Sequence, residues 1–130
     1  MKRVRGPEAG PPQATEKRQR AERRGHFAEY LAAAWLMAKG YRVLAMRYRT
    51  KRGEIDLIIR KGDLVAFVEV KARRHEGAAL DAVSYGAQHR IRAASEVWLS
   101  RRRDGGRLSY RYDVVAVLPG RLPRHFPDAF

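Results

Sequence analysis

Two apolar segments joined by a short polar turn constrain the fold of this chain more than any other feature of its sequence. Residues 53–59 and 64–71 are rich in β-branched and aliphatic side chains, and the connecting residues 60–63 include a glycine. Runs of this kind around a glycine-containing turn predict the two antiparallel strands of a β-hairpin. The second segment is apolar on both faces, so we expect it to be a central strand of a sheet.

Three charged side chains lie near one end of this predicted hairpin. If residues 61–62 form the turn, Asp56 lies opposite Phe67, and Glu69 lies diagonal to Asp56 on the same face at roughly 7 Å. Lys71 shares that face because side chains alternate along a strand. The hairpin therefore predicts that two carboxylates and an ammonium group converge beside an apolar strand.

Charged groups beside a hydrophobic core are costly unless they are paired or bind a metal ion. Carboxylate oxygens suit Mg²⁺, and a bound Mg²⁺ polarises a phosphoryl oxygen and lowers the pKa of its water. Lys71 could orient that water or stabilise developing negative charge. The alternative is a salt-bridged strand end, in which Lys71 neutralises Glu69 or Asp56. The residues alone leave both interpretations open.

The charge balance favours a polyanionic partner. The chain of 130 residues has 28 basic and 14 acidic side chains, and its net charge is +14. Nucleic acid is the first candidate and an anionic membrane surface the second. No apolar run approaches the ~20 residues of a membrane span, and no basic amphipathic helix favours a membrane surface. We therefore expect no membrane association.

The N-terminus and the cysteine content bear on localisation. The basic N-terminal residues precede no apolar segment of the kind found in secretory signals. The chain has 0 cysteines, which excludes disulfides and thiolate metal sites and is compatible with a reducing compartment. We expect a cytoplasmic protein.

The chain is expected to form one domain at residues 23–130, after a basic, disordered tail at residues 1–22. A helix is predicted at residues 26–39 and ends at Gly40. A strand is predicted at residues 41–49. The helix is expected to bury the stripe Phe27, Leu31, Ala34, Trp35 and Ala38. The strand is expected to place Val43 and Ala45 on one face and Leu44 and Met46 on the other.

The second half of the chain predicts a crossover. Residues 73–86 are interpreted as a mobile loop with a short helical turn near Leu80. A helix at residues 87–101 follows, with Ile91, Ala94 and Trp98 inward, and then a strand at residues 109–118 and a short tail. A helical crossover makes the strands before and after it parallel. The fold class is α/β, with the order α-β-β-β-α-β and a small mixed sheet flanked by helices.

Several short segments follow one another along the chain: Gly25-His26-Phe27-Ala28-Glu29, Arg47-Tyr48-Arg49, Gly53-Glu54-Ile55-Asp56-Leu57-Ile58, Phe67-Val68-Glu69-Val70-Lys71-Ala72-Arg73, Gln88, Arg111-Tyr112-Asp113-Val114-Val115 and Asp128-Ala129-Phe130. Taken together and in this order, they resemble the YraN-like family of bacterial proteins. That family is assigned to the PD-(D/E)XK, restriction-endonuclease-like superfamily. The resemblance covers roughly residues 23–130 and implies a restriction-endonuclease-like core.

The resemblance also implies a metal-dependent nuclease centre. It maps Glu29, Asp56, Glu69 and Lys71 onto the acidic residues and the lysine of that centre. Gln88 matches a glutamine that often lies beside it. Mg²⁺ or Mn²⁺ would be held by Asp56, Glu69 and the Val70 carbonyl, with Glu29 joining directly or through water. Lys71 would position the attacking water.

The implied function is hydrolysis of DNA by a magnesium-dependent nuclease, with a structure-selective, junction-resolvase-like enzyme as one version. Arg47, Arg49, Arg73 and Arg74 would hold phosphates at the rim, or would only form a solvated basic surface. An enzyme that acts on junctions is expected to be a symmetric homodimer, although the sequence shows no dimer surface. The alternatives are a non-catalytic nucleic-acid-binding module and a protein-interaction subunit that recruits a separate enzyme.

Other polar residues have narrower interpretations. Glu54 shares a strand face with Asp56 and is either a second acidic contributor or the partner of an arginine such as Arg47 or Arg52. Asp113 is interpreted as structural, paired with Arg111 or with a loop amide. The histidines show no metal-binding spacing, so we assign no zinc site. Tyr110 and Tyr112 are expected to pack on a strand face rather than to stack on bases.

Overall fold

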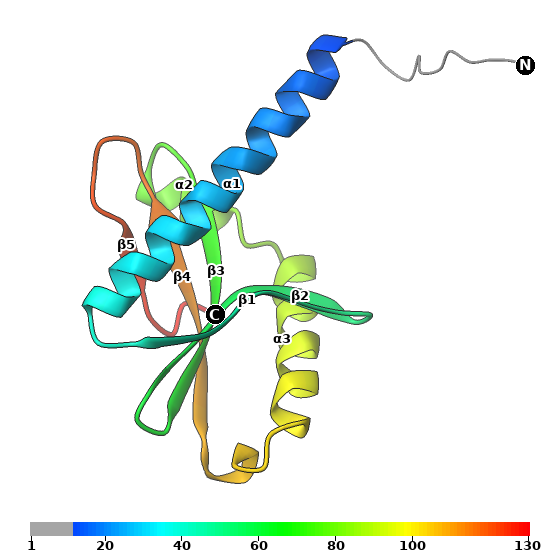
Figure 1. The fold of residues 1–130 in the computed structure, drawn as a ribbon, viewed down its shortest axis with the longest axis vertical. Helices are drawn as coiled ribbons and strands as arrows, with labels where there is room; N and C mark the ends of the chain where they lie inside the picture. Colours follow the sequence, from blue (N-terminus) through cyan, green and yellow to red (C-terminus); the bar gives the residue numbers. More distant parts are fainter. Residues whose placement is uncertain (1–11) are drawn as a thin grey trace, which may run out of the picture.

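The computed structural model describes residues 12–130, with side chains from Gly25 onward. Its elements in chain order are α1 (Pro12–Ala38), β1 (Arg42–Thr50), β2 (Gly53–Lys61), β3 (Leu64–Ala72), α2 (Glu76–Asp81), α3 (Tyr85–Ser100), the 3₁₀ turn η2 (Gly105–Arg107), β4 (Ser109–Val117) and β5 (Arg124–Phe126) (Figure 1). This confirms the predicted α/β class and the order α-β-β-β-α-β; α2 corresponds to the helical turn predicted near Leu80, and β5 is added. Residues 1–11 of the predicted tail lie outside the described residues.

The strands form one mixed sheet in the order β1-β2-β3-β4-β5. β3 and β4 are parallel, as the helical crossover predicted, and the other neighbouring strands are antiparallel. β3 is the central strand, as expected from its two apolar faces. None of the helices within residues 12–130 has both the length and the apolar character needed to span a bilayer.

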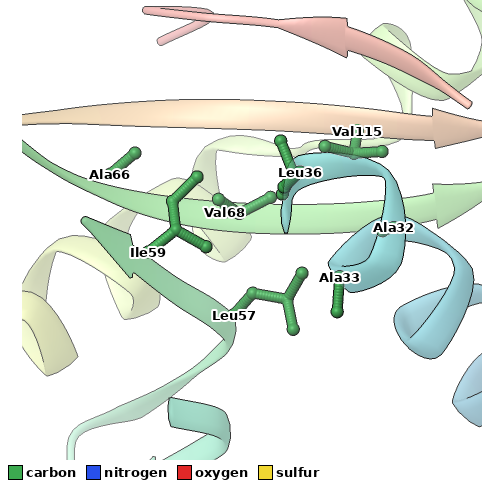
Figure 2. Packing of buried hydrophobic residues seen from close by; sticks show 8 residues of the cluster. All are labelled: Ala32, Ala33, Leu36, Leu57, Ile59, Ala66, Val68 and Val115. Carbon is green, nitrogen blue, oxygen red and sulfur yellow. The ribbon is translucent and has the colours of Figure 1, made fainter. Parts of the chain in front are cut away.

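Two hydrophobic clusters cover the two faces of the sheet. On one face, α1 packs on alternate residues of β2 and β3 and on one residue of β4 (Figure 2); the cluster is formed by Ala32, Ala33, Leu36, Leu57, Ile59, Ala66, Val68 and Val115. On the other face, α3 covers the intervening residues. Ile91, Ala94 and Trp98 are buried there against β2 and β3, which confirms the predicted inner face of this helix. The sheet therefore has a hydrophobic core on each of its faces, one covered by α1 and the other by α3.

The helix α1 differs from its prediction in two ways. It begins at Pro12 rather than near residue 26, because residues 13–24 are rich in strong helix formers and contain neither glycine nor proline. The predicted buried stripe was also wrong, since Phe27 is 63% exposed whereas Ala28 and Leu36 are buried. Between Phe27 and Ala38 the helix is apolar around most of its circumference, so periodicity did not distinguish the face on which small alanines allow close packing.

The predicted faces of β1 were wrong because the strand contains a β-bulge. Val43 pairs with Ile59 and Ala45 pairs with Ile58, so one extra residue interrupts the alternation. Val43 packs on the α1 side of the sheet, whereas Leu44 and Ala45 pack on the α3 side. Val43 and Ala45 therefore do not share a face.

The register of the β2–β3 hairpin differs from the predicted one by two residues. The last pair before the turn is Lys61 with Leu64, and Ile58 pairs with Phe67. The turn is therefore Gly62-Asp63, and Gly62 has a φ of 63°, which suits a tight turn that needs glycine at its first central position. A shift of two residues keeps every side chain on its face.

The C-terminal segment is tied to the sheet by a buried carboxylate. Asp113 is fully buried in β4. It accepts hydrogen bonds from Arg111 Nε at 2.9 Å and from the backbone N–H of Asp128 at 2.9 Å, and it lies 2.7 Å from His125 Nε2. Burial raises the pKa of Asp113, but these hydrogen bonds outweigh burial and hold the pKa below its usual value. This confirms the structural interpretation of Asp113.

Candidate functional site

A cavity of about 810 Å³ opens where β2 and β3 separate from each other. The paired residues of the two strands end at Leu57 and Val68, although β2 begins four residues earlier and β3 continues to Ala72. Three further segments complete the walls: residues 25–29 of α1, the turn between β1 and β2, and the N-terminal half of α3. The predicted residues Glu29, Asp56, Glu69, Val70, Lys71 and Arg73 all line this cavity.

Asp56 stands at the point where the two strands diverge. Its Oδ2 accepts a hydrogen bond from the backbone N–H of Val70 over 2.8 Å. The side chain thus binds a β3 amide at the point where the paired ladder has ended. With the observed register, Asp56 faces Glu69 across the fork rather than lying diagonal to it, so the two carboxylates are closer than the sequence predicted.

Glu69 lies beside Asp56 and disfavours the ionised form of Asp56. Burial is the largest cause that raises the pKa of Asp56, and the hydrogen bond and negative charge of Glu69 raise it further. Together they bring the pKa of Asp56 to about 8. The hydrogen bond from Val70 acts in the opposite direction but is weaker. Asp56 therefore holds a proton under conditions in which an isolated carboxyl would be ionised.

Lys71 follows on the same face of β3 and is ion-paired with Glu69. Its Nζ lies 3.2 Å from Glu69 Oε2, and only 12% of the Glu69 side chain is exposed. The salt-bridged arrangement considered from the sequence is therefore present, with Glu69 as the partner. The same contact also holds the ammonium group at the cavity wall beside the carboxylate pair.

Glu29 reaches the cavity from α1 but is engaged by a cation. Arg47 Nη1 donates a hydrogen bond to Glu29 Oε1 over 2.6 Å. Hydrogen bonds with Tyr30 and Glu29 raise the pKa of Arg47. Arg47 has a φ of 49°, a conformation that side-chain-bearing residues seldom adopt. Among the residues that the structure describes, no three His, Cys, Asp or Glu side chains are grouped to hold a metal ion as they stand.

Gln88 is not among the residues that line the cavity. Its Nε2 donates a hydrogen bond to the carbonyl oxygen of Val83 over 3.1 Å, at the start of α3. The residues of α3 that line the cavity are Ala87, Arg90 and Ile91. The amide of Gln88 thus fixes the local loop–helix junction in this structure.

Glu54 lines the cavity and is exposed. The prediction that it pairs with an arginine was wrong for both named partners. Arg47 binds Glu29, and Arg52 Nη2 lies 3.4 Å from Glu96 Oε1. Glu54 therefore remains an acidic residue at the mouth of the cavity.

The basic rim differs in part from the predicted one. Arg73 lines the cavity, whereas Arg49 and Arg74 are exposed outside its walls. Lys51 and Arg52 of the β1–β2 turn and Arg90 of α3 line it as well, and sequence reasoning missed all three. The turn Thr50-Lys51-Arg52-Gly53 between two predicted strands was a signal for the first two. Arg90 had no such signal because its place depends on the packing of α3.

Fold and site together define a small mixed α/β protein with a pair of facing carboxylates and a lysine at the open end of its central strands. A sequence model of the uncharacterised protein family UPF0102 matches residues 28–117. A UPF0102 protein of Rhizobium etli is 66% identical over 113 residues, which cover 87% of this chain and 93% of the relative. One from Agrobacterium fabrum is 66% identical over 116 residues, covering 89% and 95%.

A UPF0102 protein of Sinorhizobium medicae is 66% identical over 111 residues, which cover 85% of this chain and 91% of the relative. The chain belongs to the UPF0102 family. This confirms the resemblance to the YraN-like proteins at the level of the family. The matched region of the family model contains Glu29, Asp56, Glu69 and Lys71.

Proposed function

We propose that this protein is a divalent-metal-dependent nuclease that hydrolyses phosphodiester bonds in DNA. The observation that carries the proposal is the pair of Asp56 and Glu69, which face each other on the wall of a cavity of about 810 Å³ beside Lys71. A carboxyl group in a cleft whose pKa is shifted by burial and by a specific charged neighbour is typical of functional sites. The sequence motifs and the element order support a restriction-endonuclease-like centre.

The donor atoms of the cavity fit Mg²⁺ or Mn²⁺. Asp56 and Glu69 repel each other when both are ionised, and a divalent cation would relieve that repulsion. The Val70 carbonyl would supply a further oxygen from β3. Such an ion, when bound, polarises a phosphoryl oxygen and lowers the pKa of its water.

The side chains of the protein itself have distinct roles in this proposal. The Val70 amide holds the Asp56 carboxylate at the fork of the strands. Lys71, fixed by Glu69 at 3.2 Å, orients the attacking water and stabilises negative charge that develops on the phosphate. Glu29 can join the acidic group only by leaving Arg47, to which it is bonded at 2.6 Å.

A non-catalytic nucleic-acid-binding module is the second candidate function, and the same ion pairs favour it. Arg47 neutralises Glu29, and Lys71 neutralises Glu69. An acidic cluster that is neutralised in this way can serve the stability of the domain, while the net charge of +14 supports binding to a polyanion. Both candidates place the protein on nucleic acid, and we expect it in the cytoplasm in either case.

The deciding experiment is a cleavage panel of branched, flapped, single-stranded and duplex DNA with Mg²⁺ and with Mn²⁺. We expect the wild-type chain to cut at least one substrate and Asp56→Asn to cut none. Asp63→Asn is the matched control, because Asp63 is an exposed carboxylate at the opposite end of the same hairpin. If pure wild-type protein cuts no DNA or RNA with either metal, the binding module is the better conclusion.

A further inference from the structure

A series of basic depressions leads away from the cavity along α3. The first shares Thr50, Lys51 and Arg52 with the cavity wall and is also lined by Arg49 and Arg101. The next two depressions continue around the C-terminal end of α3; their linings add Arg102, Arg103, Asp104, Gly106 and Arg107. Because neighbouring depressions have lining residues in common, they form one continuous surface, which we call the basic path.

The basic path is strongly cationic. Among the residues that the structure assigns to its lining, Asp104 alone is acidic. Asp104 is already bound by Arg60 at 2.8 Å and by Arg102 at 3.1 Å. These bonds hold the pKa of Asp104 well below its usual value. Cations at the C-terminal end of a helix also complement its dipole. Arg49 lies on β1 and Lys51 in the turn after β1, so neither has that role.

The turn that begins the basic path is held rigidly on α3. The hydroxyl oxygen Thr50 Oγ1 accepts hydrogen bonds from the backbone N–H groups of Arg52 at 3.1 Å and Gly53 at 3.0 Å. The backbone of Gly53 packs so closely on α3 that an added Cβ atom would lie 2.1 Å from the carbonyl oxygen of Arg90. The backbone of the hairpin arm that crosses α3 in Figure 1, from which the cations project, is therefore held in place on the helix.

We infer that the basic path binds the phosphate backbone of a double-stranded arm of DNA whose end or junction enters the cavity. The inference rests on the proposed action on DNA and adds the position and form of the substrate. Arg90 at the cavity and Arg101 on the path are separated along α3 by roughly 16 Å, at about 1.5 Å per residue. That length corresponds to about five base pairs at roughly 3.4 Å each.

Duplex DNA fits the path better than single strands or a membrane. Proteins that hold single strands use aromatic side chains as stacking platforms, and the described lining of the three depressions contains none. Helices that lie in a membrane surface bury exposed apolar side chains in the lipid. The one large apolar residue of the lining is Val97, which is half-buried on α3. A protein can hold the backbone of a duplex through phosphate contacts alone, without contacting the bases.

The test is duplex binding by the full-length chain at several salt concentrations, measured by fluorescence anisotropy in the presence of a chelator. The double variant Lys51→Ala with Arg101→Ala removes two cations of the path. Arg42→Ala with Arg121→Ala removes two exposed cations elsewhere, at the far end of β1 and after β4. Circular dichroism and thermal unfolding confirm that both double variants are folded.

We expect the path variant to bind duplex DNA on the order of tenfold more weakly and to lower the salt slope by about two, since each phosphate contact contributes about one. The control pair should change affinity less than about twofold. Equal losses in both pairs would overturn the inference, because bulk charge would then explain binding. A larger loss for single-stranded DNA, or for vesicles of phosphatidylserine and phosphatidylcholine, would overturn it as well.

The outcome is separable from that of the proposed nuclease. Selective loss of duplex binding in the path variant supports the inference even if the cleavage panel shows no activity. Cleavage that depends on Asp56 while the path variant binds and cuts duplex substrates normally refutes the inference and leaves the nuclease intact.

Discussion

Arg47 donates a hydrogen bond to Glu29 over 2.6 Å, so the carboxylate that α1 brings to the cavity is already bound to a cation. We predict that Arg47→Met releases Glu29 toward Asp56 and Glu69 and tightens Mg²⁺ binding several-fold. Isothermal titration calorimetry checks this, with Arg49→Met on the same strand as the control. If Glu29 belongs to the acidic group, the added substitution Glu29→Gln should remove the gain. A gain that persists in the double variant would contradict the prediction.

The raised pKa of Asp56 predicts how the stability of the protein depends on pH. The pKa of Asp56 is raised from its usual 3.8 to about 8, so the folded protein holds a proton that the unfolded chain releases. Its stabilising contribution is complete below about pH 4 and is lost as the pH rises through 8, by at most about 1.4 kcal/mol per pH unit.

Urea denaturation between pH 5 and about pH 8, without divalent ions, measures this dependence. We expect the free energy of unfolding of wild type to fall across this range and that of Asp56→Asn to fall less, because asparagine does not titrate. Asp63→Asn should behave as wild type. An equal slope for wild type and Asp56→Asn would show that Asp56 does not carry the proton.

Lys71→Ala should separate catalysis from binding. The variant loses the ammonium group beside Glu69 but keeps both carboxylates, so Mg²⁺ binding should persist. Cleavage should fall on the order of 10² to 10³-fold, as when another electrostatic stabiliser is removed. Lys61→Ala, at the turn end of β2, is the control and should cut normally. A contaminating nuclease would be indifferent to both substitutions.

Asp113→Ala should be strongly destabilising. The variant leaves Arg111 and His125 without their buried partner and frees the backbone N–H of Asp128. Breaking a buried ion pair typically costs about 3–5 kcal/mol. Chemical denaturation measures the loss, and Asp81→Ala on exposed α2 should stay within about 0.5 kcal/mol.

The pH dependence of Asp113 has the opposite sign to that of Asp56. Its pKa is lowered on folding, so its contribution is present above about pH 4 and is lost as the pH falls through the folded value. Wild type should therefore lose stability in acid more steeply than Asp113→Asn. Parallel curves for the two proteins would refute this assignment.

Gly53→Ala should displace the hairpin arm from α3. A Cβ at this position would meet the backbone of Arg90 rather than a flexible side chain, and overpacking of this kind costs about 1–3 kcal/mol. Gly106→Ala is the control, since nothing lies within 4 Å of its Cβ position. Thermal unfolding compares the two, and equal unfolding temperatures would show that the arm is not tightly packed.

The sequence predicted the parts of the fold whose pattern is strong and local. The inner face of α3 followed from one helical period, and the parallel pair of β3 and β4 followed from the crossover. The bulge at Leu44 and the buried face of α1 could not be predicted. A bulge leaves no mark in a run of apolar residues, and α1 offers apolar side chains on several faces.

The candidate site also contains residues that a local sequence pattern predicts and residues whose place depends on tertiary packing. Asp56, Glu69 and Lys71 lie on one hairpin, so alternation along its strands was enough to bring them together. An error of two residues in the register left their shared face unchanged. Lys51 and Arg90 come from a turn and a helix whose approach depends on close packing at Gly53. No periodicity in the sequence records that contact.

The hydrogen bond from the Val70 amide to Asp56 gives the protein an internal spectroscopic reporter. The backbone N–H of Val70 belongs to the central strand β3, but it donates its hydrogen bond to the Asp56 carboxylate. That carboxylate is the group proposed to change its ionisation and to bind the metal ion. The Val70 amide resonance should therefore follow the state of that carboxylate directly, while the neighbouring amides of β3 follow the sheet. A single nitrogen-15 signal can thus distinguish a chemical event at the site from a change in the fold around it.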